Sequence, residues 1–324
     1  MGNNLPAKIY TKKNETQTRL VFEFGNVDGQ QKVGGFIDLA QALSAANKRA
    51  YRQGLYYYVN SFEVQALQSG YVDIKVAPDT WQTRRAWVRA FDKYQEMNEL
   101  VDTPRPKYHD FKMFLDSTHR NDIGTGLDIK KNSLPVGVGS AGTTATFECD
   151  EWQYAQYVSA QDRNIASNTA NQFNIHLIGD HLGTGPADYD SIGAIYSYQN
   201  SRKYPIANTG EPSVVNIADD DPLALLHQGS EVHQIEEIAN HLDVMNDFVP
   251  YDYNKDVGSG DNHLIPLRRL HTDSTSSTRS HEVSGACIPL GLMRIDSDNY
   301  TAPWRLIVNV AVGTYNGVYA ERVF

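Results

Sequence analysis

The 324 residues include 39 acidic and 29 basic side chains, which gives a formal charge of −10 with neutral histidine. This balance excludes a generally basic nucleic-acid coat, and a hydrophobic content of 40% is enough to form a core. Two cysteines, Cys149 and Cys287, exclude a cysteine-rich metal module. No apolar run reaches the roughly 20 residues of a membrane span, and the first residues lack the apolar core of a signal peptide. We therefore expect a product made in the cell interior, without a membrane span.

Alternating apolar and polar residues predict strands at residues 20–24, 55–67 and 71–76. An Ala-rich stretch at residues 37–51 predicts a helix between the first two strands. Residues 80–100 predict a second helix, preceded by Pro78 and with Asp79 or Thr80 as its cap. Within it, Trp87, Phe91 and Tyr94 form one apolar stripe, which we expect to pack on the β core while the arginines face outward.

Later strands are predicted at residues 173–178, 304–312 and 318–324, and helices at 191–201 and 230–247. A Gly- and Pro-rich stretch at 134–144 predicts a connector. The comparable series of elements on its two sides predicts two tandem β units, residues 1–142 and 143–324. Residues 180–261 hold 15 acidic and three basic side chains, which predicts an acidic loop region facing away from nucleic acid.

One set of residues could bind a metal ion. His233, Glu237 and His241 follow a spacing of four, which would place all three on one helical face within reach of a single ion, and zinc would accept such ligands. The more ordinary interpretation is a solvated helix face. The acidic stretches 219–221 and 252–261 could hold calcium, but acidic loops are usually hydrated. We expect no cofactor.

Nucleic acid could bind to the helix at 80–100, where basic and aromatic residues alternate. Arginine forks contact phosphates and indoles stack on bases, and the basic side chains here are Arg84, Arg85, Arg89 and Lys93, around Trp81 and Trp87. The alternative is an amphipathic helix with a basic outer face. The Gly-rich residues 179–185 lack the ending of a phosphate-binding loop and predict a turn, and no nucleophile motif is found. We expect no enzymatic activity.

Four stretches carry a resemblance to a known family. They are residues 81–91 (WQTRRAWVRAF), 108–116 (YHDFKMFLD), 285–295 (GACIPLGLMRI) and 312–321 (VGTYNGVYAE). They are similar to blocks in capsid proteins of environmental circular single-stranded DNA viruses. The resemblance implies a mainly β viral jelly roll. We favour a double, tandem jelly roll over a single one with long helical insertions.

The resemblance also implies the function and the partners. It implies the major capsid protein of a small DNA virus, located in the virion, which self-assembles, possibly through trimeric capsomers, into an icosahedral shell around a single-stranded DNA genome. Such proteins often carry an Arg-rich N-terminal arm, which is missing here, so genome contacts would come from ordered surface such as residues 84–93, or the DNA is enclosed without tight coating. For contacts between subunits we expect matched charges, with the basic side chains Lys8, Lys12, Lys13 and Arg19 facing the acidic region.

Two other functions are compatible with the sequence. A lectin-like jelly-roll module would recognise sugars through exposed aromatic residues such as Tyr56, Tyr57 and Tyr58, with a calcium ion held by acidic residues. A cupin-like metalloprotein would collect histidines from several strands.

Overall fold

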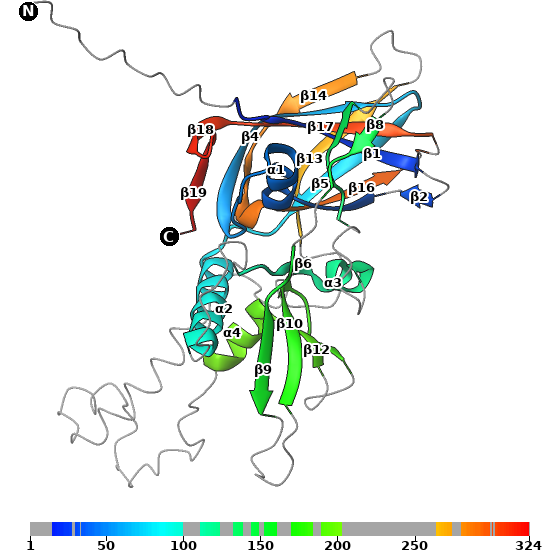
Figure 1. The fold of residues 1–324 in the computed structure, drawn as a ribbon. Helices are drawn as coiled ribbons and strands as arrows, with labels where there is room; N and C mark the ends of the chain where they lie inside the picture. Colours follow the sequence, from blue (N-terminus) through cyan, green and yellow to red (C-terminus); the bar gives the residue numbers. More distant parts are fainter. Residues whose placement is uncertain are drawn as a thin grey trace, which may run out of the picture.

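The computed structural model describes residues 15–27, 30–32, 34–99, 111–123, 132–138, 144–148, 152–160, 170–183, 189–202, 264–273, 280–298, 300 and 302–323. Strands dominate this part of the chain, which confirms the prediction of a mainly β protein. Two large sheets form a sandwich, and a smaller unit of helices and strands lies below it in Figure 1.

The first large sheet is antiparallel and has the order β14-β4-β17-β1. Its strands are β1 (Arg19–Val27), β4 (Leu55–Gln65), β14 (Ser280–Ser284) and β17 (Trp304–Val310). Short strands extend it, namely β2 (Gln30–Lys32) beside β1, and β15 (Cys287–Ile288) and β19 (Ala320–Arg322) beside the beginning of β4. A further short strand, β18 (Val312–Tyr315), follows β17.

The second large sheet is also antiparallel and has the order β13-β5-β16-β3. Its strands are β3 (Gly34–Asp38), β5 (Gly70–Val76), β13 (Ile265–Thr272) and β16 (Leu292–Asp298). A 3₁₀ turn, η5 (Pro289–Gly291), leads into β16.

The pairing between the early and late strands is nested. β1 pairs with β17, β3 with β16, β4 with β14, and β5 with β13. Each large sheet therefore combines two strands that precede residue 142 with two that follow it. This pairing does not follow the predicted division into units 1–142 and 143–324, because pairing partners are chosen by burial across the whole chain and not by sequence proximity.

The sandwich core consists of the apolar positions that alternate along each strand. Phe22 and Phe24 of β1 and Leu306 and Val308 of β17 are fully or almost fully buried. Helix α1 (Leu39–Asn47) closes one side of this core. It begins later than the predicted residue 37 because residues 34–38 pair with β16 as strand β3.

A long insertion connects β5 to β13. It contains α2 (Trp81–Glu99), β6 (Phe114–Asp116), α3 (Ser117–Ile123), β9 (Gln156–Ala160), β10 (Ala170–Ile178), β11 (Leu182–Gly183), β12 (Tyr189–Gly193) and α4 (Ala194–Arg202). Strand β10 runs parallel to β6 and β12 and antiparallel to β9. Residues 191–193, predicted as the start of a helix, belong to β12. The described helices all lack the combination of length and apolarity that a membrane crossing requires.

The predicted connector at 134–144 is in part regular structure. Strands β7 (Val136–Val138) and β8 (Thr144–Thr146) form an antiparallel hairpin. The predicted final strand is shorter than expected, since only residues 320–322 form β19.

The insertion packs on the sandwich through a second hydrophobic cluster. Phe36 and Leu292 of the sandwich meet Trp87 of α2, Met113 before β6, and Leu177 of β10 in this cluster. Each of these side chains is nearly or fully buried. The insertion and the sandwich therefore share one apolar interface, which we call the junction.

The side chain of Gln53 adds polar contacts to the junction. Its Nε2 donates to the Oδ2 of Asp38 (2.8 Å) and to the carbonyl of Met113 (3.1 Å), and its Oε1 accepts from the backbone N–H of Met113 (2.7 Å). Asp38 also caps α1, because its Oδ1 accepts from the N–H groups of Ala40 and Gln41. One amide therefore connects the sandwich to the insertion.

We expect Gln53→Ala to lower the free energy of unfolding by about 2 to 4 kcal/mol, because two buried backbone groups of Met113 lose their side-chain partner. Urea denaturation followed by tryptophan fluorescence measures this. The control is Gln65→Ala at the end of β4, with an expected cost below about 1 kcal/mol. Equal stability of the two variants would contradict the connecting role of Gln53.

Candidate nucleic-acid interface

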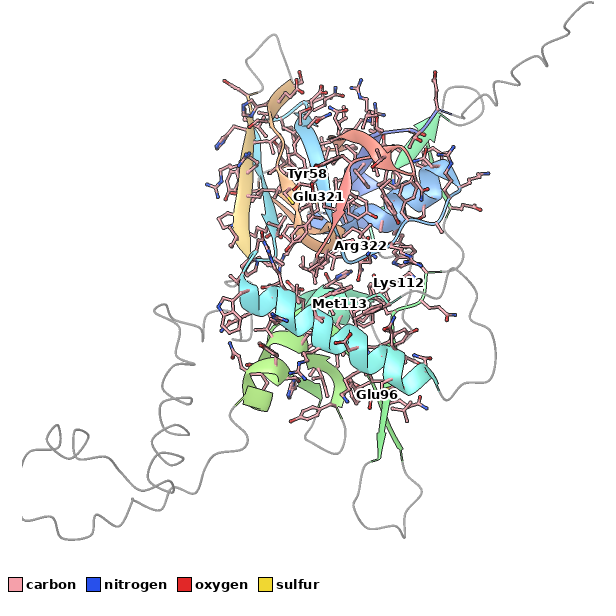
Figure 2. The ribbon with its side chains drawn as sticks, turned by 90° about the vertical axis from the view of Figure 1, so that its left-hand side faces the viewer. Tyr58, Glu96, Lys112, Met113, Glu321 and Arg322 are labelled. Atoms are coloured by element: carbon pink, nitrogen blue, oxygen red, sulfur yellow. The ribbon has the colours of Figure 1, made fainter. Side chains whose placement is uncertain are left out.

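Helix α2 lies across the junction with one face buried. Figure 2 shows it crossing the molecule below the sandwich, with Met113 at the boundary and Glu96 toward its end. Its bounds agree with the prediction to one residue at each end. The Thr80 hydroxyl accepts from the N–H of Thr83 (3.2 Å) and so caps the first turn.

The predicted apolar stripe of α2 is confirmed as its packing face. Trp87 is 7% exposed, and its ring stacks on Phe91 (5.2 Å between centroids) and meets Phe111 edge-on (5.6 Å). Tyr94 also contacts Phe111 (5.4 Å). The stripe packs on the junction, and not on the core between the two sheets. The arginines of the first turns point outward, as predicted.

Two of the four predicted nucleic-acid contacts have acidic partners within the chain. Arg84 forms a bidentate pair with Asp79 (both distances 2.9 Å), and Asp79 also accepts from the hydroxyl of Tyr56 (2.6 Å). The bonds from Arg84 lower the pKa of Asp79, so this carboxylate is charged at neutral pH. Lys93 pairs with Glu96 one turn later (2.5 Å). Both cations are therefore neutralised locally.

Arg85 and Arg89 differ from these two. Both side chains are exposed, and neither has an ion-pair partner among the described residues. Trp81 precedes Arg85 by four residues, is 39% exposed, and meets Tyr198 of α4 edge-on (6.3 Å). These positions share one helix face because they are spaced by four. The contribution of α4 could not be read from the sequence, since Tyr198 lies over a hundred residues away.

Several other predicted site residues lie outside the described residues. They are Lys8, Lys12, Lys13, His233, Glu237 and His241, together with the acidic stretches 219–221 and 252–261. Arg19 is described, and it lies 3.5 Å from Glu63 of β4 in its own chain. Within the described part, no group of three or more His, Cys, Asp or Glu side chains could hold a metal ion.

The Gly-rich residues 179–183 lie at the carboxyl end of β10, beside the ends of β6 and β12. Ligands often bind at this edge of parallel sheets. Here the chain fills the edge itself. His176 bonds to the hydroxyl of Ser191 (2.8 Å) and the carbonyl of Asp180 (2.9 Å), and the His181 ring accepts from the N–H of Gly193 (3.2 Å). His176 and Ser191 are fully buried, so this pair has a packing role.

A lectin-like module would need Tyr56, Tyr57 and Tyr58 to be exposed, and this expectation is wrong for two of the three. Tyr57 is fully buried and Tyr56 nearly so. Tyr58 is partly exposed, and its hydroxyl lies 3.1 Å from the carboxylate of Glu321, beside which it is drawn in Figure 2. The three side chains therefore do not form a shared exposed aromatic platform.

The interior of the sandwich also differs from that of a cupin-like metal site, which would bring several histidines together from its strands. Among the described residues the two buried histidines, His119 and His176, both belong to the insertion. His119 bonds through its ring to the N–H of Leu115 (3.0 Å) and to Asn132 (2.8 Å). These bonds occupy both ring nitrogens.

No family model, curated protein or solved structure matches this chain. The arrangement of the strands and the exposed face of α2 are therefore the two observations from which the function can be argued.

Proposed function

We propose that this protein is the major capsid protein of a small DNA virus and that its two large sheets form one jelly roll with a long insertion. The observation that carries the proposal is the nested antiparallel pairing of eight strands. A jelly roll has two facing sheets of this kind, formed from two Greek keys, and it is the fold of many viral capsid and lectin domains.

The strand order supports a single jelly roll over a tandem one. In chain order, the eight strands are β1, β3, β4, β5, β13, β14, β16 and β17. The first, third, sixth and eighth form one sheet, and the other four form its partner. The long insertion falls between the fourth and fifth strands. A tandem fold would need two such sets of strands, whereas each large sheet here draws on both ends of the chain.

The four stretches that resemble capsid proteins supply a second line of support. Trp87, Met113 and Leu292 come from three of these stretches, and all three side chains lie in the junction cluster. The fourth stretch includes the beginning of β19, which pairs with β4. Three of the four stretches thus contribute to the junction, and the stretches 285–295 and 312–321 also contribute to the sandwich core.

The proposal predicts particles of megadalton mass, and their response to salt reports which contacts hold the subunits together. Subunits with a formal charge of −10 repel one another unless apolar or matched charged contacts hold them together. Light scattering and electron microscopy of the purified protein, at constant pH, measure particle mass between 0.1 M and 1 M salt, where the Debye length falls from about 10 Å to about 3 Å.

Each outcome of this experiment has one meaning. Particles that dissociate at 1 M salt indicate matched charges, and Lys12→Glu with Lys13→Glu should then imitate high salt. Particles that persist at 1 M salt indicate a shell held by apolar contacts. A dimer or trimer under all conditions would contradict the capsid proposal and favour a lectin-like module.

A further inference from the structure

The outer face of α2 carries a stripe of three exposed side chains, Trp81, Arg85 and Arg89. Successive members are four residues apart, which corresponds to a rise of about 6 Å along the helix. All three are exposed, and α2 lies on the surface turned to the viewer in Figure 2. We call them the α2 stripe.

The two arginines of the α2 stripe differ from the neighbouring basic side chains of α2 in their ion pairs. Arg84 and Lys93 each have a carboxylate within 3 Å. Arg85 and Arg89 have none within ion-pair distance among the described residues, although they are like charges at a spacing that brings them together. Lys93 continues the spacing of four, but it is paired with Glu96, so Arg89 is the last basic side chain of this face without an acidic partner among the described residues. Two neighbouring guanidinium groups with no ion pair inside the described part of the chain can bind two anionic groups.

Trp81 adds an aromatic surface at the start of the stripe. Of the four tryptophans in the chain, Trp87, Trp152 and Trp304 are at most 7% exposed, whereas Trp81 is 39% exposed. Tyr198 supports it from the side through an edge contact. A supported indole beside two arginine forks matches the way single-stranded nucleic acid is bound, through base stacking and phosphate contacts.

We propose that the α2 stripe binds single-stranded nucleic acid, with Arg85 and Arg89 on neighbouring phosphates and a base stacked on Trp81. This deepens the proposed function, because it names the surface through which a capsid subunit would contact its genome. The site spans about two phosphates and is therefore weak in one subunit. An acidic peptide from a second copy would satisfy the two arginines but would not use the indole, so nucleic acid is the better match.

The test measures binding of a short fluorescein-labelled oligothymidylate to the full chain by fluorescence anisotropy, at several salt concentrations. Arg85→Gln with Arg89→Gln should weaken binding roughly tenfold, the effect of two exposed charged contacts. It should also make the slope of log affinity against log salt shallower by about 1.4, because each phosphate of a single strand contributes about 0.7. Trp81→Ala should weaken binding roughly five- to a hundredfold through the loss of one stacked base.

The matched control is Arg269→Gln with Arg305→Gln, which removes the same charge at exposed positions on strands β13 and β17 of the sandwich. It should leave the affinity within about twofold of the unmodified protein. Unlabelled oligothymidylate should also quench tryptophan emission, and Trp81→Phe should abolish that quenching, because the other three indoles are buried.

Three results would overturn the inference. These are no binding by the unmodified protein, an equal loss in the control variant, or a change in self-association without a change in oligonucleotide affinity when Arg85 and Arg89 are replaced. The last would assign the stripe to an acidic segment of a second copy. Particle mass is measured on the same samples. Particles that bind no oligonucleotide contradict the stripe alone, and oligonucleotide binding without particles contradicts the shell alone.

Discussion

Replacing Trp87 with alanine is expected to lower the free energy of unfolding by about 3 to 5 kcal/mol, the usual cost of removing a large buried aromatic side chain. Trp87 is 7% exposed and packs against Phe91 and Phe111. Its indole also lies against Gly54, where a Cβ would collide with the ring. Its removal would therefore open a cavity that neighbouring side chains cannot readily fill.

Trp81→Ala provides the matched control, because it deletes the same side chain from the exposed part of the same helix. We expect it to cost about 1 kcal/mol or less. Urea denaturation monitored by circular dichroism compares the two variants without depending on tryptophan emission. If Trp87→Ala were as stable as Trp81→Ala, the junction would not depend on the packing face of α2.

Acidification is expected to destabilise the protein through two buried histidines. Burial lowers the pKa of His119 and of His176 to about 4, from an ordinary value of 6.5. Between pH 6.5 and pH 4, the unfolded chain therefore binds protons at these two histidines that the folded chain does not bind. Stability from each histidine is fully present above pH 6.5 and is lost as the pH falls toward 4. Each should account for about 2 to 3 kcal/mol between pH 7 and pH 4.5.

Asp38 acts in the opposite direction. Burial raises its pKa to about 6, from 3.8, in spite of the hydrogen bonds from Gln53 and the first turn of α1. Its contribution is fully present below pH 3.8 and is lost as the pH rises through 6. The loss caused by the histidines on acidification is therefore offset in part by this carboxyl group.

The test compares urea midpoints at pH 7 and pH 4.5 for the unmodified protein, His119→Gln and His176→Gln. Each variant should be less stable at pH 7, because hydrogen bonds of the ring are lost, but its stability should change less with pH. The exposed His271 on β13 supplies the control for the loss of a ring, and His271→Gln should leave the stability at pH 7 nearly unchanged. An unchanged pH dependence in both buried variants would contradict the assignment.

Part of the site and fold was predictable because it depends on neighbours in the sequence. The spacing of Trp87, Phe91 and Tyr94 predicted the buried face of α2, since a helix brings residues three and four apart onto one side, and the cap at Asp79 or Thr80 predicted where the helix begins. The strand at residues 71–76 was predicted for the corresponding reason, because alternation with a period of two defines the two faces of a strand.

Other features depended on residues that are distant in the sequence. Alternation tells which face of β1 is buried, but it does not tell that β1 pairs with β17, nearly three hundred residues away. The same limit explains why the strands do not separate at residue 142. The sequence also could not tell that Tyr198 of α4 would lie beside Trp81 of α2.

The sequence by itself therefore determined the local elements and the side of each that is buried, because helical and strand periodicities act over a few residues. Only the tertiary structure decided the nested order of the sheets, the place where the insertion packs on the sandwich, and the contact of Tyr198 with Trp81. These depend on which apolar faces and which charges the complete chain brings together, and long-range pairing is selected by the total area that it buries.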